Sequence, residues 1–188
     1  DRDYFKATLG LHAGEVHLSE FDLNRERGVI EQPYRPTLRV STPILTPAGK
    51  IFGMVVINMD ASHLLARSTS GLPEGVQARI TNMSGEYLLH PDPSRSFGFE
   101  LGGKDNIITD FPGVKTLFDT QTPELLFLQA AAAKTGNQYV AAGRIHFDSG
   151  VPARFMVLTY QIPDAVAAQQ IARIPARNIV GGFLAVLL

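Results

Sequence analysis

A guanidinium and a carboxylate occur on the two strands of one predicted hairpin, Arg39 on the first strand and Asp60 at the end of the second. An arginine presents a planar fork of donors that matches a carboxylate, and an aspartate accepts hydrogen bonds from an ammonium group. Together they would suit an amino acid, another small zwitterion or a small organic acid. The alternative is that Arg39 and Asp60 pair with each other or face solvent.

The five histidines do not predict a metal site. None pairs with another histidine or a carboxylate at the i, i+4 spacing of a helical metal motif, and only His12 and Glu15 lie three residues apart, across a predicted helix end. Cysteine is absent, which removes disulfides, thiolate nucleophiles and cysteine-based zinc sites. The sequence therefore predicts no metal and no cofactor.

The chain also lacks the local motifs of common enzymes: a nucleophile elbow, a phosphate-binding glycine loop or an HExxH helix. The glycine-rich residues 98–103 do not open a βαβ unit, and residues 24–26 are interpreted as a loop whose side chains bond local backbone amides. The sequence predicts no catalytic residues and no enzymatic activity. An enzyme assembled from scattered acidic residues and histidines is left open as an alternative.

Composition narrows the partner classes. The 188 residues are 45% hydrophobic, which is ordinary for a chain that buries a core, as one large domain or two small ones. The formal net charge of −1 comes from 17 basic and 18 acidic residues with no long run of either sign. Nucleic acid is therefore not an expected partner. The absence of cysteine fits the periplasm, although many cytosolic proteins also lack it.

The hairpin that carries Arg39 and Asp60 is indicated by its turn, residues 46–49, in which Pro47 presets φ and Gly49 tolerates a positive φ. Residues 37–45 and 50–60 are the predicted strands. The second strand contains a nearly continuous apolar run, which predicts a strand covered on both faces or central in a sheet. A helix is expected over residues 4–11 and a half-buried strand over residues 15–21.

A second unit follows a predicted linker, residues 71–75, which contains two glycines and a proline. Its predicted elements are strands at 76–81, 86–90, 139–147 and 153–161, a helix at 114–120 and an apolar stretch at 125–133. Residues 82–85 predict a second tight turn. This order predicts a small antiparallel sheet whose ligand side is covered by the insertion between the strand pairs.

From Pro163 the pattern predicts a helix, and residues 179–188 form an unbroken apolar run. Ten residues reach about half of a roughly 30 Å hydrocarbon core. The run is interpreted as the start of a transmembrane helix, and an ordinary core helix is the alternative. Ala165, Ala168 and Ile171 share one helix face, and Ala167, Ala168 and Ala172 are small enough for close helix approach. A homodimer is therefore possible.

Several segments, in this order, resemble a double Cache sensor domain, a PAS-like extracytoplasmic module of bacterial histidine kinases, diguanylate cyclases and chemoreceptors. The first half carries residues 3–5, 14–19, 23–30 and 36–43, and the second half carries residues 85–93, 97–100 and 110–112. Unlike the complete family pattern, the chain has no long N-terminal helix and no opening strand pair. The first unit is therefore expected to be incomplete.

The resemblance implies an α+β fold of two Cache units, each an antiparallel sheet with covering helices. Residues 1–70 would be the membrane-distal or first unit, 71–162 the membrane-proximal or second unit, and 163–188 an output helix entering the membrane. A small ligand would bind in the first unit, at Tyr4, Ser19, Arg39 and Asp60. The predicted function is extracytoplasmic ligand sensing in a bacterial inner-membrane receptor. The alternative is a structural or protein-interaction ectodomain without a small ligand.

Overall fold

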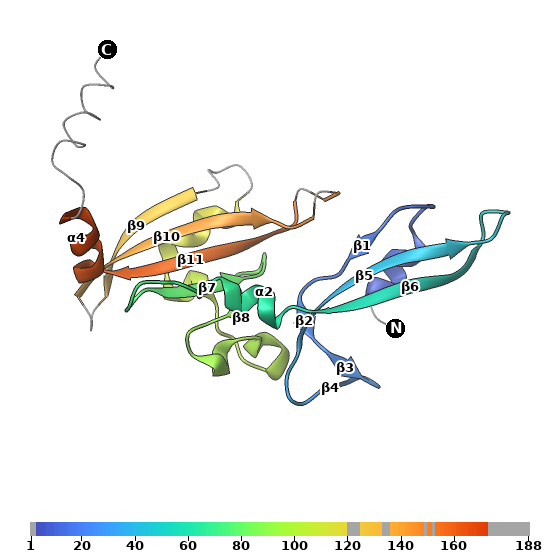
Figure 1. The fold of residues 1–188 in the computed structure, drawn as a ribbon, viewed down its shortest axis with the longest axis horizontal. Helices are drawn as coiled ribbons and strands as arrows, with labels where there is room; N and C mark the ends of the chain where they lie inside the picture. Colours follow the sequence, from blue (N-terminus) through green and yellow to red (C-terminus); the bar gives the residue numbers. More distant parts are fainter. Residues whose placement is uncertain (1–2, 120–124, 133–135, 149, 152, 173–188) are drawn as a thin grey trace, which may run out of the picture.

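The computed structural model describes residues 3–119, 125–132, 136–148, 150–151 and 153–172. Every strand pairing in it is antiparallel, and the sheets are accompanied by a few short helices. The β5–β6 hairpin and the larger sheet lie toward opposite ends of the long axis of the molecule (Figure 1). The predicted α+β class with antiparallel sheets is confirmed.

The first unit is built around β5 (Pro36–Leu45), which pairs on one side with β6 (Ile51–Asp60) and on the other with two short strands. These are β1 (His17–Leu18) and β2 (Asp22–Leu23). The unit also contains α1 (Asp3–Leu9), α2 (Ser62–Arg67) and the small ribbon of β3 (Arg25–Glu26) and β4 (Val29–Ile30).

The β5–β6 turn forms as its sequence predicts. Gly49 has a φ of 74°, and its N–H donates to the Thr46 carbonyl at 2.8 Å. Thr46 Oγ1 also accepts from the Lys50 N–H at 3.1 Å. The second predicted turn is confirmed too, because Gly85 has a φ of 81° and a Cβ there would lie 2.6 Å from Asn106 Oδ1.

Polar residues occupy the buried side of β5. Its burial alternates along the strand, and the buried positions include Thr37, Arg39 and Ser41, whereas Leu38 and Val40 on the other face are half-buried. A half-buried strand normally shows the opposite pattern, with apolar residues inside. Buried polar groups need hydrogen-bond partners, so this side of β5 is organised by polar contacts.

The prediction for β6 is wrong. Its apolar run is not covered on both faces, since Phe52 is 79% exposed and Val55, Ile57 and Met59 are also exposed. Within the described residues β6 pairs only with β5 and is therefore an edge strand. A run of apolar residues has the same appearance in a central strand and in an edge strand whose faces are open, so periodicity alone did not separate them.

The second unit is a five-stranded sheet in the order β8-β7-β11-β10-β9 with an insertion between β8 and β9. The strands are β7 (Gln77–Thr81), β8 (Tyr87–Leu89), β9 (Leu125–Ala132), β10 (Gly136–His146) and β11 (Phe155–Pro163). The insertion contains η1 (Pro93–Arg95), η2 (Gly98–Leu101), α3 (Ile107–Asp110) and η3 (Pro112–Phe118), and α4 (Asp164–Ala172) follows β11.

The two faces of this sheet carry two separate hydrophobic clusters. On one face the insertion packs against the sheet, through Tyr87, Ile107, Val114, Leu117, Val140, Ala142, Phe155 and Val157. On the other face the sheet contacts the first unit, through Phe21, Leu23, Ala61, Leu65, Ile80, Leu88, Phe97 and Met156. The two units therefore share one core, although the boundary near residues 71–75 itself stays a prediction.

Three elements differ from the sequence prediction. The strand expected over residues 15–21 is reduced to β1, His17–Leu18, and the carbonyl of the next residue, Ser19, accepts from Arg154 of the second unit. The helix expected at 114–120 is the 3₁₀ helix η3, and the apolar stretch at 125–133 is strand β9. The apolar run at 179–188 lies outside the described residues, and no helix within the described ranges could cross a membrane.

The two sheets should differ in amide hydrogen exchange. Since β11 pairs with both β10 and β7 whereas β6 pairs only with β5, we expect lower protection in residues 51–60 than in residues 155–161. Exchange monitored by mass spectrometry on the 188-residue chain checks this. Equal and high protection in both strands would contradict the assignment of β6 as an edge.

Candidate functional site

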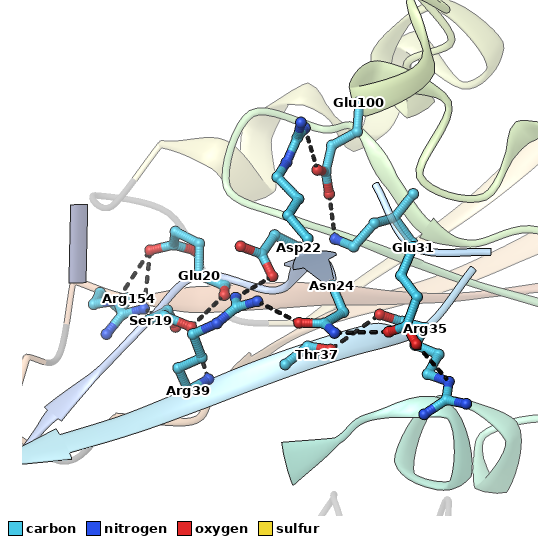
Figure 2. A network of polar contacts seen from close by, with 12 residues as sticks. Ser19, Glu20, Asp22, Asn24, Glu31, Arg35, Thr37, Arg39, Glu100 and Arg154 are labelled. Carbon is cyan, nitrogen blue, oxygen red and sulfur yellow. Dashed lines mark hydrogen bonds and ion pairs between the residues drawn. The ribbon is translucent and has the colours of Figure 1, made fainter. Parts of the chain in front are cut away.

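Arg39 is the centre of the polar network in the first unit. It is 0% exposed, and its guanidinium donates to Asp22 Oδ1 from Nη1 at 2.5 Å and to Asn24 Oδ1 from Nη2 at 3.0 Å. The guanidinium also lies 5.6 Å from the centre of the Tyr4 ring. Figure 2 shows Asp22 and Asn24 converging on it. Arg39 thereby fixes α1 and the chain around β2 against β5.

Ser19 continues the network along the backbone of β5. Its N–H donates to the Arg39 carbonyl at 2.8 Å, and its Oγ accepts from the Arg39 N–H at 2.8 Å. The hydroxyl of Ser41, further along β5, lies 2.6 Å from Thr8 Oγ1 on α1. Because Thr8 Oγ1 donates to the Tyr4 carbonyl at 2.6 Å, Ser41 is the donor in that pair. These contacts explain why the buried side of β5 is polar.

Asp60 does not oppose Arg39 in this structure. Its carboxylate accepts from the Ser62 N–H at 2.8 Å at the start of α2, and hydrogen bonding from the Ser62 side chain and then from its N–H lowers the pKa of Asp60. Across the hairpin Arg39 pairs with Asn58, whereas Asp60 pairs with Thr37. The carboxylate that faces the guanidinium is Asp22, from a strand that follows β1 in the chain. The carboxylate paired with Arg39 is thus Asp22 and not Asp60, and a role for Asp60 in ligand binding stays a prediction.

A cleft of about 600 Å³ opens beside this network, where the first unit meets the second. Tyr4 and Ser19, both predicted as site residues, line it together with Asp22, whereas Arg39 lies behind them and Asp60 is elsewhere. The complete lining is Asp3, Tyr4, Ala7, His17, Leu18, Ser19, Glu20, Phe21, Asp22, Arg25, Asn82, Phe99, Val151 and Arg154. Its volume lies within the usual range for a small-molecule site.

The lining of the cleft carries charges of both signs. Asp3, Glu20 and Asp22 supply carboxylates, and Arg25 and Arg154 supply guanidinium groups. His17 is held toward its neutral form, because burial and then the charge of Arg154 lower its pKa. Part of the Asp22 side chain, 38%, remains accessible even though it binds Arg39. A wall with both charges can orient a ligand that itself carries both.

Arg154, just before β11, ties the second unit to the first. Its Nη1 donates to the Leu18 carbonyl at 2.6 Å and its Nη2 to the Ser19 carbonyl at 2.7 Å. The same guanidinium pairs with Glu20 at 3.0 Å (Figure 2). It also pairs with Asp148 at 2.8 Å. The pair with Asp148 is shielded from solvent, since the two side chains are 12% and 13% exposed, whereas the Glu20 side chain is 61% exposed.

Glu100 in η2 makes a second link between the units. Its carboxylate accepts from the Leu23 N–H and from Arg25 Nη2 at 2.9 Å, which joins the insertion of the second unit to β2 and β3. Burial raises the pKa of this carboxyl, and the hydrogen bond from Leu23 opposes that shift. With Arg154, Glu100 fixes the segment between β1 and β3 from both ends.

Sequence reasoning missed Asp22, Arg154 and Glu100. Asp22 belongs to a charged, proline-containing loop, and Arg154 lies 135 residues after Ser19. No spacing in the sequence connects them, since their proximity depends on how the two units pack. Within the described ranges, no group of three or more metal-ligating side chains comes together.

Two stacked antiparallel PAS-like units with a polar cleft at their junction define a sensor-domain architecture. Residues 1–119 match the family model described as "Bacterial histidine kinase, sensor domain". The chain belongs to this family, and the predicted assignment to Cache-type bacterial sensors is confirmed. No curated protein matched the sequence.

Solved structures with the same fold are sensor domains. A domain of a putative sensory box/GGDEF family protein from Vibrio parahaemolyticus is 19% identical with a TM-score of 0.69, covering 89% of this chain and 60% of that one. The extracellular domain of the putative histidine kinase vpHK1S-Z8 is also 19% identical with a TM-score of 0.69, covering 92% and 58%.

A third structure is the ligand-binding domain of the Pseudomonas aeruginosa PAO1 amino acid chemoreceptor PctC, in complex with GABA. It is 18% identical with a TM-score of 0.54, covering 86% of this chain and 60% of that one. The chain thus spans about 60% of the length of these neighbours. At such identities the likeness shows the fold, which is that of extracellular and periplasmic sensor domains.

The contribution of Arg154 can be tested with a matched arginine. Arg154→Ala should lower the free energy of unfolding by about 3 kcal/mol, because it leaves buried carbonyls and carboxylates without their charged donor. Arg35→Ala removes only an exposed pair with Glu31 at 3.9 Å and should cost less than about 0.5 kcal/mol. Urea denaturation measures both. Equal losses would show that Arg154 does not hold the units together.

Proposed function

We propose that this chain is the ligand-binding part of the extracytoplasmic region of a bacterial transmembrane receptor, and that it binds a small amino acid in the cleft between its two units. The observation that carries the proposal is the cleft itself, whose lining combines carboxylates, guanidinium groups and the aromatic ring of Tyr4. A zwitterion requires both kinds of charge in one site. An aromatic ring adds apolar contact and can lie against an ammonium group.

The ammonium group would bind at Asp22, with Glu20 nearby on the same wall. Asp22 is held in place by Arg39, so it is an oriented acceptor and not a mobile surface carboxylate. Ser19 and Tyr4 would contact the ligand directly. Arg39, which the sequence predicts as the carboxylate ligand, would instead act as a positioning residue through Asp22 and Tyr4. Asp60 is not part of the proposed site.

The carboxylate of the ligand would lie toward the basic side of the lining, where Arg25 and Arg154 supply positive charge. The chemoreceptor PctC, whose structure contains GABA, shows that the same fold accommodates a molecule with one amine and one carboxylate. A structural ectodomain without a ligand would be expected to fill this junction with apolar side chains. The charged lining supports ligand binding over that alternative.

The response to a ligand would pass from the cleft to α4. Arg154 lies in the cleft and directly precedes β11, and β11 continues without a gap into α4. We propose that α4 leads toward the membrane beside its counterpart in a homodimer, and that any catalytic activity belongs to a cytoplasmic part of the receptor. In this arrangement a shift of β11 moves the helix.

Ligand binding is tested by thermal denaturation of the protein with a panel of amino acids and organic acids. A ligand at about 100 times its dissociation constant adds roughly 2.7 kcal/mol to the free energy of unfolding. We expect stabilisation by amino acids and not by acids that lack an amine. Calorimetric titration of a stabilising amino acid should then show at least about tenfold weaker binding to Asp22→Asn, because a charged acceptor is lost.

Asp60→Asn is the matched control for this experiment. It makes the same chemical change at the aspartate that the sequence predicts and that is not among the residues lining the cleft. We expect it to bind the amino acid as the wild type does. Loss of binding in Asp60→Asn but not in Asp22→Asn would overturn the proposed site, and no stabilisation by any amino acid would overturn the ligand class.

The dimeric arrangement of α4 is tested by cysteine crosslinking in the full-length receptor. Ala165 and Ala168 are exposed and one turn apart, so Ala165→Cys and Ala168→Cys should form disulfides across a dimer. Val166, which is half-buried, is the control, and Val166→Cys should not crosslink. The yield at the two exposed positions should change on ligand addition. Absence of crosslinks at both, with and without ligand, would contradict the dimer.

A further inference from the structure

Arg154 lines the cleft, but the protein itself supplies acceptors to its guanidinium. Its Nε donates to Glu20 Oε1 at 3.1 Å, and its Nη2, which lies 3.0 Å from the same oxygen, donates to the Ser19 carbonyl at 2.7 Å. Its Nη1 donates to the Leu18 carbonyl at 2.6 Å and to Asp148 Oδ2 at 2.8 Å. All three nitrogens are therefore occupied, and the carboxylate of a ligand would have to displace one of these acceptors to bind Arg154.

The lining of the cleft and the side chains paired with it carry more negative than positive charge among the described residues. The carboxylates are Asp3, Glu20 and Asp22 in the lining and Glu100 and Asp148 behind it, whereas the guanidinium groups are Arg25, Arg39 and Arg154. His17 does not restore the balance, because burial lowers its pKa. A zwitterion leaves this excess of negative charge unchanged, whereas a ligand with an additional cationic group reduces it.

Glu20 and Asp22 each bind an arginine and still present accessible surface to the cleft. Asp22 accepts from Arg39 through Oδ1, and 38% of its side chain is exposed. Glu20 accepts from Arg154 through Oε1, and 61% of its side chain is exposed. The arginines orient both carboxylates, and each carboxylate has a second oxygen with further acceptor capacity.

The separation of these two carboxylates suits the two amines of a diamino acid. Glu20 and Asp22 are two residues apart in the chain, so their Cα atoms are separated by at most about 7 Å. In an extended lysine six bonds separate the two nitrogens, which is also about 7 Å. One ligand can thus reach both carboxylates. The aromatic rings of Tyr4 and Phe99, which also line the cleft, offer apolar surface to the methylene chain between the amines.

We propose that the amino acid bound in the cleft carries a side-chain ammonium group, as lysine and ornithine do, and that Glu20 is the residue that selects it. This inference rests on the proposed function. The α-ammonium group binds Asp22, the side-chain ammonium group binds Glu20, and the ligand carboxylate faces Arg25, whose side chain is 37% exposed. Because Glu20 also binds Arg154, the selecting contact lies directly on the link between the two units.

Calorimetric titration of the full chain with L-lysine and L-norleucine tests this specificity, since norleucine has the same carbon chain without the side-chain amine. Lysine should bind at least about tenfold more tightly than norleucine, because only lysine makes the second charged contact. Glu20→Gln should reduce the affinity for lysine to about that for norleucine and leave norleucine binding unchanged. Glu74→Gln, at an exposed glutamate that does not line the cleft, is the matched control and should bind both as the wild type does.

The outcomes separate this inference from the proposed function. Equal binding of lysine and norleucine to the wild type, or undiminished lysine binding to Glu20→Gln, would overturn the selection by Glu20 and leave the amino acid site standing. Weaker binding of both amino acids to Glu20→Gln would also overturn it, because Glu20 would then act only by holding Arg154. Absence of binding by every amino acid tested would overturn the proposed function and this inference with it.

Discussion

The first unit depends on neutralising one buried cation. Moving a guanidinium out of water is expensive unless a carboxylate and further acceptors replace its hydration, and Arg39 obtains these from Asp22 and Asn24. Because both acceptors come from the segment after β1, the requirement forces that segment to close over β5. The same guanidinium also holds α1 over β5, because the ring of Tyr4 on α1 lies against it. The polar interior is thus the cause of the local fold as well as the wall of the cleft.

The two units are joined by a shared apolar core and by polar contacts on both sides of it. Apolar packing between Leu23 or Leu65 and the larger sheet supplies most of the attraction, but such packing is non-directional. Arg154 and Glu100 add direction, because each binds backbone groups of the first unit at defined positions. A ligand in the proposed site would touch the same segment that Arg154 holds. Its binding energy can therefore bias the position of β11 without any further connecting element.

The sequence predicted what is decided locally and missed what is decided by packing. The turns at Gly49 and Gly85 depend on a few adjacent residues, and both were predicted correctly. The exposure of β6 was not predicted correctly, because the same apolar run is compatible with a strand covered on both faces and with an exposed edge strand. Asp22 could be identified as the partner of Arg39, in place of the predicted Asp60, only when the path of the chain after β1 was known. Arg154 could be placed only once the units were docked.

Two buried arginines, Arg39 and Arg79, are stabilised in different ways. Arg39 has a carboxylate from its own chain, so its charge is used to orient Asp22, and the accessible part of that aspartate favours the positive end of a ligand. Arg79 instead donates from Nη2 to the neutral Gln77, and its guanidinium lies 5.3 Å from the centre of the Phe111 ring. A carboxylate therefore neutralises Arg39, whereas a neutral amide and an aromatic ring contact Arg79. The two units thus stabilise a buried guanidinium by different chemistry, and in the first unit this places an oriented carboxylate, Asp22, in the wall of the cleft.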